Sequence, residues 1–159
     1  QRFLEGFRYL GGFLVSIDGT GHFASSSIHC PHCCERHYRN GRIGYYHQLL
    51  AAVLVHPDQK AVLPLFPEAI THQDGACKND CELNASKRLL KPLRDAFPNG
   101  PIRVVEDGLF ANGPHIKLLK ELKLGYIISV KPDGQESLFA EINRRLCRGE
   151  YEEFETRDA

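Results

Sequence analysis

The chain has 159 residues, of which 42% are hydrophobic, and its 20 basic and 20 acidic side chains give a formal net charge of +0. A chain of this length can bury one sizeable core, and no linker or internal repeat divides it, so we expect one domain. Strong DNA binding by the chain as a whole is excluded, because such binding requires an excess of Lys and Arg to neutralise phosphates. No apolar run reaches the length of a membrane span and no signal peptide is visible, which favours a cytoplasmic protein.

The N-terminal half predicts a helix end followed by three strands. Residues 1–12 have the pattern of the tail of a preceding helix. Residues 13–28 predict a strand that passes into an irregular stretch, 43–55 predict an aromatic and β-branched strand, and 61–70 predict a third strand after a turn at 56–60. We expect these three strands to form an antiparallel meander.

The C-terminal half alternates helices and strands. Asp80 is placed to cap a helix, and Glu82 suits the positive first turn of that helix. Residues 102–107 predict a fourth strand, and 126–130 predict a fifth. Further helices are expected from Gly113-Pro114, with Ile116, Leu119 and Leu122 facing inward, and over 137–148, with Leu138, Ile142 and Leu146 one turn apart. The order βββαβαβ predicts an α/β fold with a mixed sheet, in which three antiparallel strands precede parallel ones, and with flanking helices.

Two of these strands end in a carboxylate followed by a glycine. Asp18 precedes Gly19 after the first strand, and Asp107 precedes Gly108 after the fourth. If the two strands are parallel neighbours, the carboxylates lie side by side at one sheet edge, where ligands collect in open α/β sheets. Like charges held that close repel unless a cation lies between them, and oxygen ligands favour Mg²⁺ or Mn²⁺. The alternative is that each Asp-Gly pair only makes a turn.

Five of the six cysteines gather in two segments, at 30–34 and 77–81. Cys30 and Cys33 have the two-residue spacing that lets two thiolates bind one tetrahedral Zn²⁺, and Cys77 and Cys81 offer a second pair. The meander would bring both segments to the same end of the sheet, beside Asp18. The alternative is that these residues are reduced thiols without a metal.

Basic residues form three groups. The group most suited to DNA contains Arg36, Arg39 and Arg42, which flank the expected acidic edge, together with Tyr38, which can stack on an unpaired base. The other two groups have the pattern of ordinary solvated helix faces and comprise Lys87, Arg88, Lys91 and Arg94, and Arg144, Arg145 and Arg148.

Three stretches of the chain resemble one known family. FLVSIDGTGHFASSSIHCPHC, the later YYHQLL, and VVEDGLFANGPHIKLLKELKLGYIISVKP are similar, in wording and order, to the catalytic domain of bacterial insertion-sequence transposases of the DDE type. The resemblance covers about residues 13 to 132. It implies an RNase H-like fold, whose element order the predicted elements follow, and phosphodiester hydrolysis followed by strand transfer at transposon ends.

The resemblance also implies site residues and partners. Asp18 and Asp107 would be the first two catalytic acids and would hold two Mg²⁺ or Mn²⁺ ions, with DNA as substrate and a homo-oligomer assembling on it in the bacterial cytoplasm. The family's third acid is a Glu in a Tyr-x-x-Arg-x-x-x-Glu pattern, which this sequence lacks. We therefore interpret 13–150 as a partial catalytic domain, inactive alone, and 151–159 as the start of a following segment or insertion.

Two other functions are compatible with the sequence. In another metal-dependent phosphotransfer enzyme Asp18 would be the nucleophile, although the usual motif repeats an Asp two positions later, where this chain has Thr20. A zinc-stabilised interaction module without catalysis would use the cysteines alone. Binding of Mn²⁺ separates the transposase from the module, and covalent trapping by a phosphoryl mimic separates it from the phosphotransferase.

Overall fold

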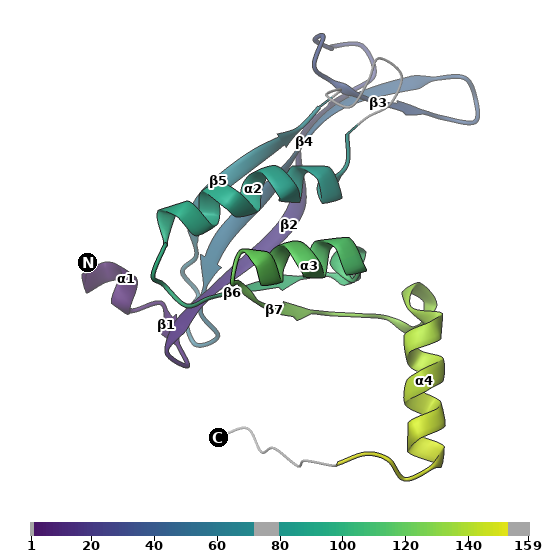
Figure 1. Ribbon diagram of the computed structural model, residues 1–159. Coiled ribbons are helices and arrows are strands. Elements are labelled where there is room, and N and C mark those ends of the chain that lie inside the picture. Colours follow the sequence, from purple (N-terminus) through teal and green to yellow (C-terminus); the bar gives the residue numbers. More distant parts are fainter. Residues whose placement is uncertain (1, 72–79, 153–159) are drawn as a thin grey trace.

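The computed structural model describes residues 2–71 and 80–152 (Figure 1). In chain order its elements are α1 Arg2–Glu5, β1 Arg8–Tyr9, β2 Gly12–Ser25, β3 Cys34–His37, β4 Ile43–Val55, β5 Leu63–Ile70, α2 Glu82–Ala96, β6 Ile102–Glu106, η1 Gly108–Phe110, α3 Gly113–Glu121, β7 Gly125–Ile128, η2 Pro132–Gly134 and α4 Glu136–Cys147, where η marks a 3₁₀ turn.

One mixed sheet contains all the strands. β2, β4 and β5 pair antiparallel in the order β2-β4-β5, and β6 and β7 extend the other side of β2 as parallel strands. The short strands β1 and β3 pair with β2 and β4. The predicted α/β fold, with three antiparallel strands before two parallel ones and flanking helices, is confirmed at this level.

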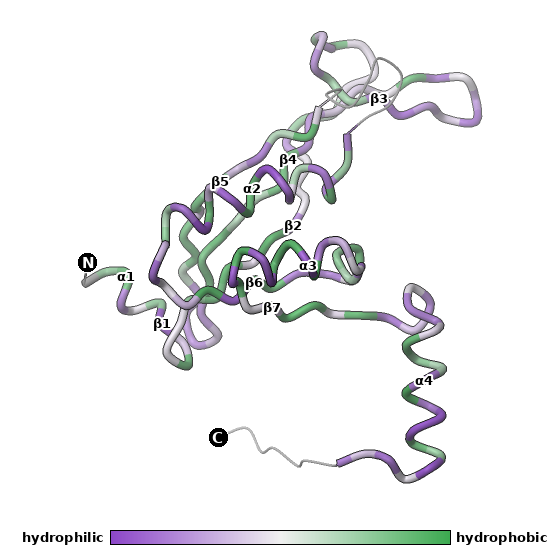
Figure 2. Tube along the Cα trace, in the orientation of Figure 1, coloured by the Kyte–Doolittle hydropathy of each residue, from purple (hydrophilic) through white to green (hydrophobic). Residues whose placement is uncertain are grey.

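Two helices cover one face of the sheet. α2 packs on β4 and β5, α3 packs near β7, and the two helices touch each other (Figure 1). The strands beneath them are mostly hydrophobic (Figure 2). The core they enclose is built from aliphatic side chains of every layer, among them Val15, Ile17, Leu50, Leu54, Leu89, Leu90, Leu93, Val104 and Leu119. Burying such side chains away from water is the main force that holds helices on a sheet.

The antiparallel ribbon of β2 and β4 is longer than the core. From Phe13 to Ile17 most residues of β2 are buried, whereas from Asp18 to Ser25 none is. The ribbon therefore continues past α2 as a projecting arm, on which β3 pairs with the first residues of β4 (Figure 1). Asp18 lies where the covered part of the ribbon passes into the arm.

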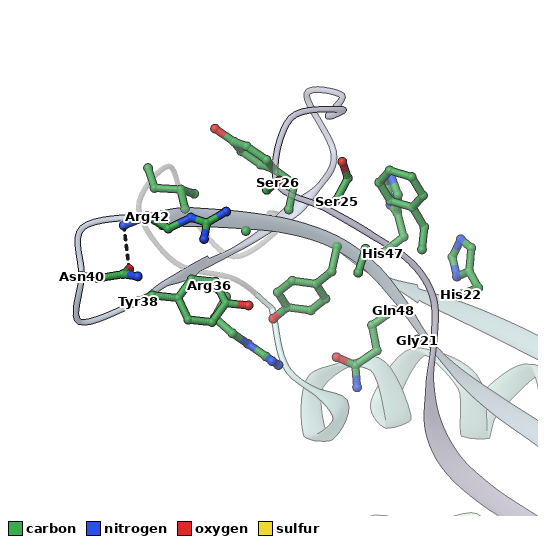
Figure 3. Close-up of a pocket in the computed structure, with 16 residues that line it drawn as sticks. Gly21, His22, Ser25, Ser26, Arg36, Tyr38, Asn40, Arg42, His47 and Gln48 are labelled. Carbon is green, nitrogen blue, oxygen red and sulfur yellow. Dashed lines mark hydrogen bonds between the residues drawn. The ribbon is translucent and has the colours of Figure 1, made fainter.

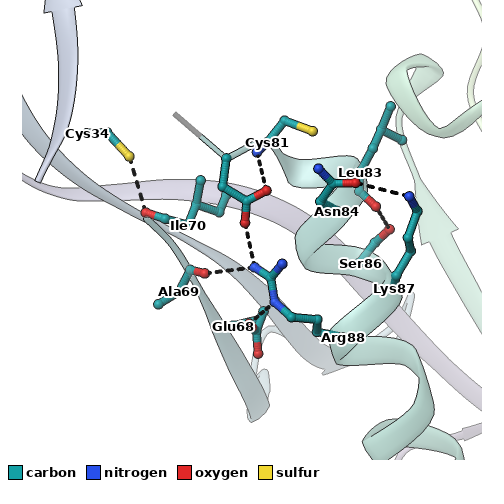
Figure 4. Close-up of polar contacts among 11 residues, drawn as sticks. Cys34, Glu68, Ala69, Ile70, Cys81, Leu83, Asn84, Ser86, Lys87 and Arg88 are labelled. Atoms are coloured by element: carbon teal, nitrogen blue, oxygen red, sulfur yellow. Dashed lines mark hydrogen bonds and ion pairs between the residues drawn. The ribbon is translucent and has the colours of Figure 1, made fainter. Parts of the chain in front are cut away.

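Several local expectations need correction. Asp80 does not cap α2: Cys81 is the N-cap residue, and the buried Asp80 carboxylate instead accepts the Cys81 N–H (2.8 Å) and pairs with Arg88 (2.6 Å). Arg88 also bonds Glu68 and the Ala69 carbonyl, so it ties α2 to the end of β5 (Figure 4). The Asp80 carboxylate is therefore engaged in this ion pair and does not cap the helix.

The expected helix tail over 1–12 also needs correction, whereas the helix predicted over 137–148 is confirmed as α4. Among residues 2–12 only Arg2–Glu5 is helical, and Arg8–Tyr9 pairs with β2. In α3 the buried residues are His115 and Leu119, while Ile116 is only half-buried. α4 stands away from the sheet, and its apolar residues stay exposed: Leu138, Ile142 and Leu146. None of the described helices has both the length and the apolar character needed to cross a bilayer.

Candidate functional site

The two predicted acids lie on neighbouring strands, Asp18 inside β2 and Asp107 directly after the end of β6. β2 and β6 are parallel, with Ser16 opposite Val105, and continuing this register by two residues aligns Asp18 with Asp107. Both side chains are exposed. Asp18 accepts the Gly19 N–H (2.8 Å), and Asp107 caps the η1 turn through the Leu109 N–H (3.0 Å). The expected parallel pairing of the two strands is therefore present, but the expected strand end at Asp18-Gly19 is wrong, because β2 stays paired with β4 through Gly19 and continues to Ser25.

A third carboxylate lies beside them. Glu82, in the first turn of α2, accepts a 2.5 Å hydrogen bond from Gln48 of β4. Gly19 makes room for this contact, because a Cβ at that position would overlap the Glu82 carboxylate and stand 2.8 Å from Gln48 Nε2. Burial, and then the negative charges of Asp18 and Asp107, raise the pKa of the Glu82 carboxyl above its ordinary value. Three carboxylates therefore share one electrostatic environment.

Sequence reasoning placed Glu82 only as a favourable helix residue. No local pattern identifies its place beside Asp18, because that proximity follows from how α2 packs on β4 and β5. The first turn of α2 places the Glu82 carboxylate close enough to Asp18 and Asp107 for their charges to affect it. Only the packing of α2 on β4 shows the resulting proximity.

A buried polar network includes Glu106, the residue that precedes Asp107. The carboxylate of Glu106 bonds Nε2 of His115 (2.9 and 3.0 Å), and both side chains are almost wholly excluded from solvent. Nδ1 of His115 faces the Ser86 hydroxyl of α2 at 3.5 Å. This chain of contacts joins β6, α3 and α2 directly beneath the end of β6, so the backbone that carries Asp107 is held by the core.

A second cluster of metal-ligating atoms lies on the projecting arm. Cys30 Sγ, Cys33 Sγ and His47 Nε2 all lie within 4.8 Å of one another, and they are the only such group of three among residues 2–71 and 80–152. The three carboxylates described above are therefore not gathered this closely. A Cys/His cluster that could hold a metal ion is present, as the spacing of Cys30 and Cys33 predicts, but its third member is His47.

The other two cysteines of the predicted set do not join this cluster. Cys81 is exposed at the N-cap of α2, and Cys77 lies outside the described residues. Cys34, next to the cluster, is fully buried, and its Sγ contacts the Ile70 carbonyl at 3.3 Å (Figure 4). Burial, followed by the charges of Asp80 and Cys33, raises the pKa of the Cys34 thiol, which keeps it protonated at neutral pH.

The arm also carries a hollow of about 890 Å³. Among the residues that the structure describes, its lining contains no Asp or Glu, although the chain as a whole is neutral. The side chains around it that carry a guanidinium, imidazole, phenol or long amide group and are labelled in Figure 3 are His22, Arg36, Tyr38, Arg42, His47 and Gln48. The hollow therefore combines positive charge with aromatic faces.

The predicted basic loop divides between a strand and a turn. Arg36 lies on β3, with its guanidinium 5.4 Å from the centre of the Tyr46 ring, and Arg42 lies just before β4. Both line the hollow, whereas Arg39 is exposed in the turn and does not. Because Gln48 also lines the hollow and bonds Glu82, the hollow begins beside the carboxylate group.

No protein-family model matches the chain, and no curated protein matches its sequence. What the chain does is therefore inferred from the chemistry of these groups.

Proposed function

We propose that the chain is the catalytic domain of a DNA transposase of the DDE type, which hydrolyses phosphodiester bonds at transposon ends and transfers the strands to a target. It would act in the bacterial cytoplasm, as a homo-oligomer assembled on DNA. The observation that carries this proposal is the alignment of Asp18, inside β2, with Asp107, directly after β6, when the parallel register of these neighbouring strands is continued. The order of the long strands and of α2 and α3 agrees with the RNase H-like order βββαβαβ, with β1 and β3 as additions.

The donor set suits a hard divalent cation. Asp18 and Asp107 present exposed carboxylates, and burial, followed by the charges of these two residues, raises the pKa of Glu82. Asp18 and Asp107 would hold Mg²⁺ or Mn²⁺, and Glu82 would offer a further carboxylate oxygen. When bound, the metal supplies Lewis-acid stabilisation of the phosphoryl oxygens. Glu82 stands in a different element from the family's third acid, so it adds to the site without replacing that residue.

The hollow on the arm supports DNA as the substrate. It begins beside Glu82 and carries Arg36 and Arg42, and the part of its lining that the structure describes contains no carboxylate. Arginine guanidinium groups bind phosphates, and Tyr38 offers an aromatic face on which an unpaired base can stack. A DNA end lying in this hollow would place its backbone next to the carboxylates.

The test is Mn²⁺ binding, measured from the loss of the free-ion signal in electron paramagnetic resonance on zinc-saturated protein. We expect Asp18→Ala combined with Asp107→Ala to weaken Mn²⁺ binding by about tenfold or more, because it removes both ligands. The matched control combines Asp95→Ala with Asp133→Ala, which removes the same charge from two exposed sites elsewhere. Equal binding by the Asp18/Asp107 variant and the parent would overturn the assignment of the site.

The Cys/His cluster favours a second candidate, a structural-zinc interaction module without catalysis. In that case the chain would hold zinc tightly, and neither pair of Asp substitutions would change Mn²⁺ binding. The same titration therefore distinguishes the two functions.

A further inference from the structure

We propose that Cys30, Cys33 and His47 bind one Zn²⁺ ion, and that this ion fastens the turn before β3 to β4 and thereby fixes one wall of the hollow. The proposal does not depend on any reaction at the carboxylates. It replaces the cysteine-only ligand set suggested by spacing with a set that includes an imidazole from a strand.

The distances between the three ligand atoms fit a tetrahedral zinc ion. With Zn–S bonds of about 2.3 Å, Zn–N bonds of about 2.0–2.1 Å and tetrahedral angles, two sulfurs should lie about 3.8 Å apart, and a sulfur and a nitrogen about 3.6 Å apart. In the structure the two sulfurs are 3.8 Å apart, and His47 Nε2 lies 3.4 Å from Cys30 Sγ and 3.3 Å from Cys33 Sγ. All three distances are close to those that a single ion would set.

The backbone brings these atoms together through two neighbouring features. The Cys33 N–H bonds the Cys30 carbonyl (3.1 Å), which closes the turn, and the Cys30 N–H points to Cys33 Sγ at 3.3 Å. Cys34 then pairs with Tyr46, so extending the register by one residue sets Cys33 opposite His47. The turn and the β3–β4 pairing together therefore place the two sulfurs beside the His47 imidazole.

A redox-active pair explains this arrangement less well. The two thiols are not joined by a disulfide, and a dithiol pair alone would leave the contact of both sulfurs with His47 Nε2 unexplained. Activated Cys-x-x-Cys thiols commonly sit at a helix N-terminus, but this turn leads into the strand β3. Two thiolates with one imidazole are the soft donors that select zinc over Mg²⁺ or Mn²⁺.

The position of the cluster indicates what the ion does. Cys30, Pro31 and His32 are exposed, so the turn gains little from apolar burial, and only Cys33 and Cys34 are buried. His47 lines the hollow and stacks against His22, with ring centres 5.6 Å apart. An ion joining His47 to the turn would hold this wall of the hollow in place. Three protein ligands with water as the fourth are a known zinc arrangement.

The first test measures zinc per chain in protein that is purified with zinc and then dialysed against a weak chelator. We expect about one equivalent in the parent and a loss of about tenfold in His47→Ala, because one of three protein ligands is removed. Two matched controls should keep the full equivalent: His22→Ala, which removes the imidazole stacked on His47, and Cys147→Ser, which removes an exposed thiol on α4. Full zinc content in His47→Ala, or an equal loss in a control, would overturn the ligand set.

The second test needs no variant and remains informative if His47→Ala does not fold. The parent chain is alkylated with iodoacetamide, with and without zinc, and the modified cysteines are identified by mass spectrometry. We expect zinc to slow alkylation of the exposed Cys30 by about tenfold or more, because a bound thiolate is a poorer nucleophile, and to leave the exposed Cys147 unchanged. Equal rates at Cys30 with and without zinc, or a Cys30–Cys33 disulfide in the purified protein, would overturn the proposal. Because neither test involves DNA or Mn²⁺, their failure is distinct from failure of the proposed transposase function.

Discussion

The carboxylate group and the Cys/His cluster of this chain lie in different surroundings. Asp18 lies on β2 where α2 still covers the ribbon, Glu82 lies on α2 and Asp107 follows β6, whose last residue, Glu106, is buried in a pair with His115. Cys30, Cys33 and His47 lie on the arm, where few residues are buried. The comparison shows two ways to hold reactive groups in position: packing against a core holds the first group, and in our proposal a metal ion holds the second.

The largest expected effect is the loss of stability in His115→Ala, which removes one side chain of the buried pair behind Asp107. It leaves the Glu106 carboxylate buried without its partner and removes the ring packed on Phe110, so we expect the free energy of unfolding to fall by about 3 kcal/mol or more. The measurement is urea unfolding followed by circular dichroism. Zinc content, measured under native conditions, should stay at the parent value because the arm does not contact His115.

The control for this variant is a second His–Glu pair on the surface. His37 and Glu35 are 3.3 Å apart, and the His37 side chain is 69% exposed. Water solvates such a pair in either state, so His37→Ala should cost no more than about 0.5 kcal/mol. If the two His→Ala variants lower the free energy of unfolding by the same amount, the buried Glu106–His115 pair does not hold the end of β6 that leads to Asp107.

Gly19→Ala tests the carboxylate group alone, because it displaces the Glu82 carboxylate and leaves the core intact. The new methyl group would occupy the space of the Glu82 carboxylate, which is the flexible end of a side chain and can turn away. We expect stability to change by less than about 1 kcal/mol, but Mn²⁺ affinity to fall severalfold as Glu82 leaves the site. Gly21→Ala, where the nearest atom to the new Cβ is 3.8 Å away, is the matched control. Unchanged Mn²⁺ affinity in Gly19→Ala would show that Glu82 takes no part in the site.

The long elements of this fold could be predicted from sequence because their patterns are strong. Aromatic and β-branched residues mark β4, whose observed bounds, Ile43–Val55, coincide with the prediction. The strand Cys34–His37 is too short and too polar to be distinguished from a loop. Its hairpin turn contains Asn40-Gly41, a common hairpin signal that could have revealed the pairing.

The residues of the candidate sites differ in the same way, because some have a local sequence signal and others have none. Asp18 and Asp107 could be identified because each follows an apolar strand. His47 could not, because it lies inside a strand whose partner was missed, and only the β3–β4 register brings it to Cys33. Glu82 could not be placed either, because its proximity to Asp18 depends on how α2 packs across the sheet, which no local pattern specifies.

The smallest expected effect is the pH dependence of Glu82→Gln, which tests whether the carboxylates repel one another. The pKa of Glu82 is raised in the folded state, so its charged form opposes folding above that pKa, and this penalty disappears as the pH falls through the folded pKa toward the unfolded value. Glutamine keeps an oxygen for the hydrogen bond from Gln48 and carries no charge. We therefore expect Glu82→Gln to raise Tm by roughly 1–2 °C at pH 7 in metal-free buffer and to have no effect at pH 4.

With added Mn²⁺ at pH 7, we expect Glu82→Gln to lower Tm relative to the parent, because the parent then gains a ligand that the variant lacks. An equal rise in Tm at both pH values would show that the gain comes from packing rather than from charge.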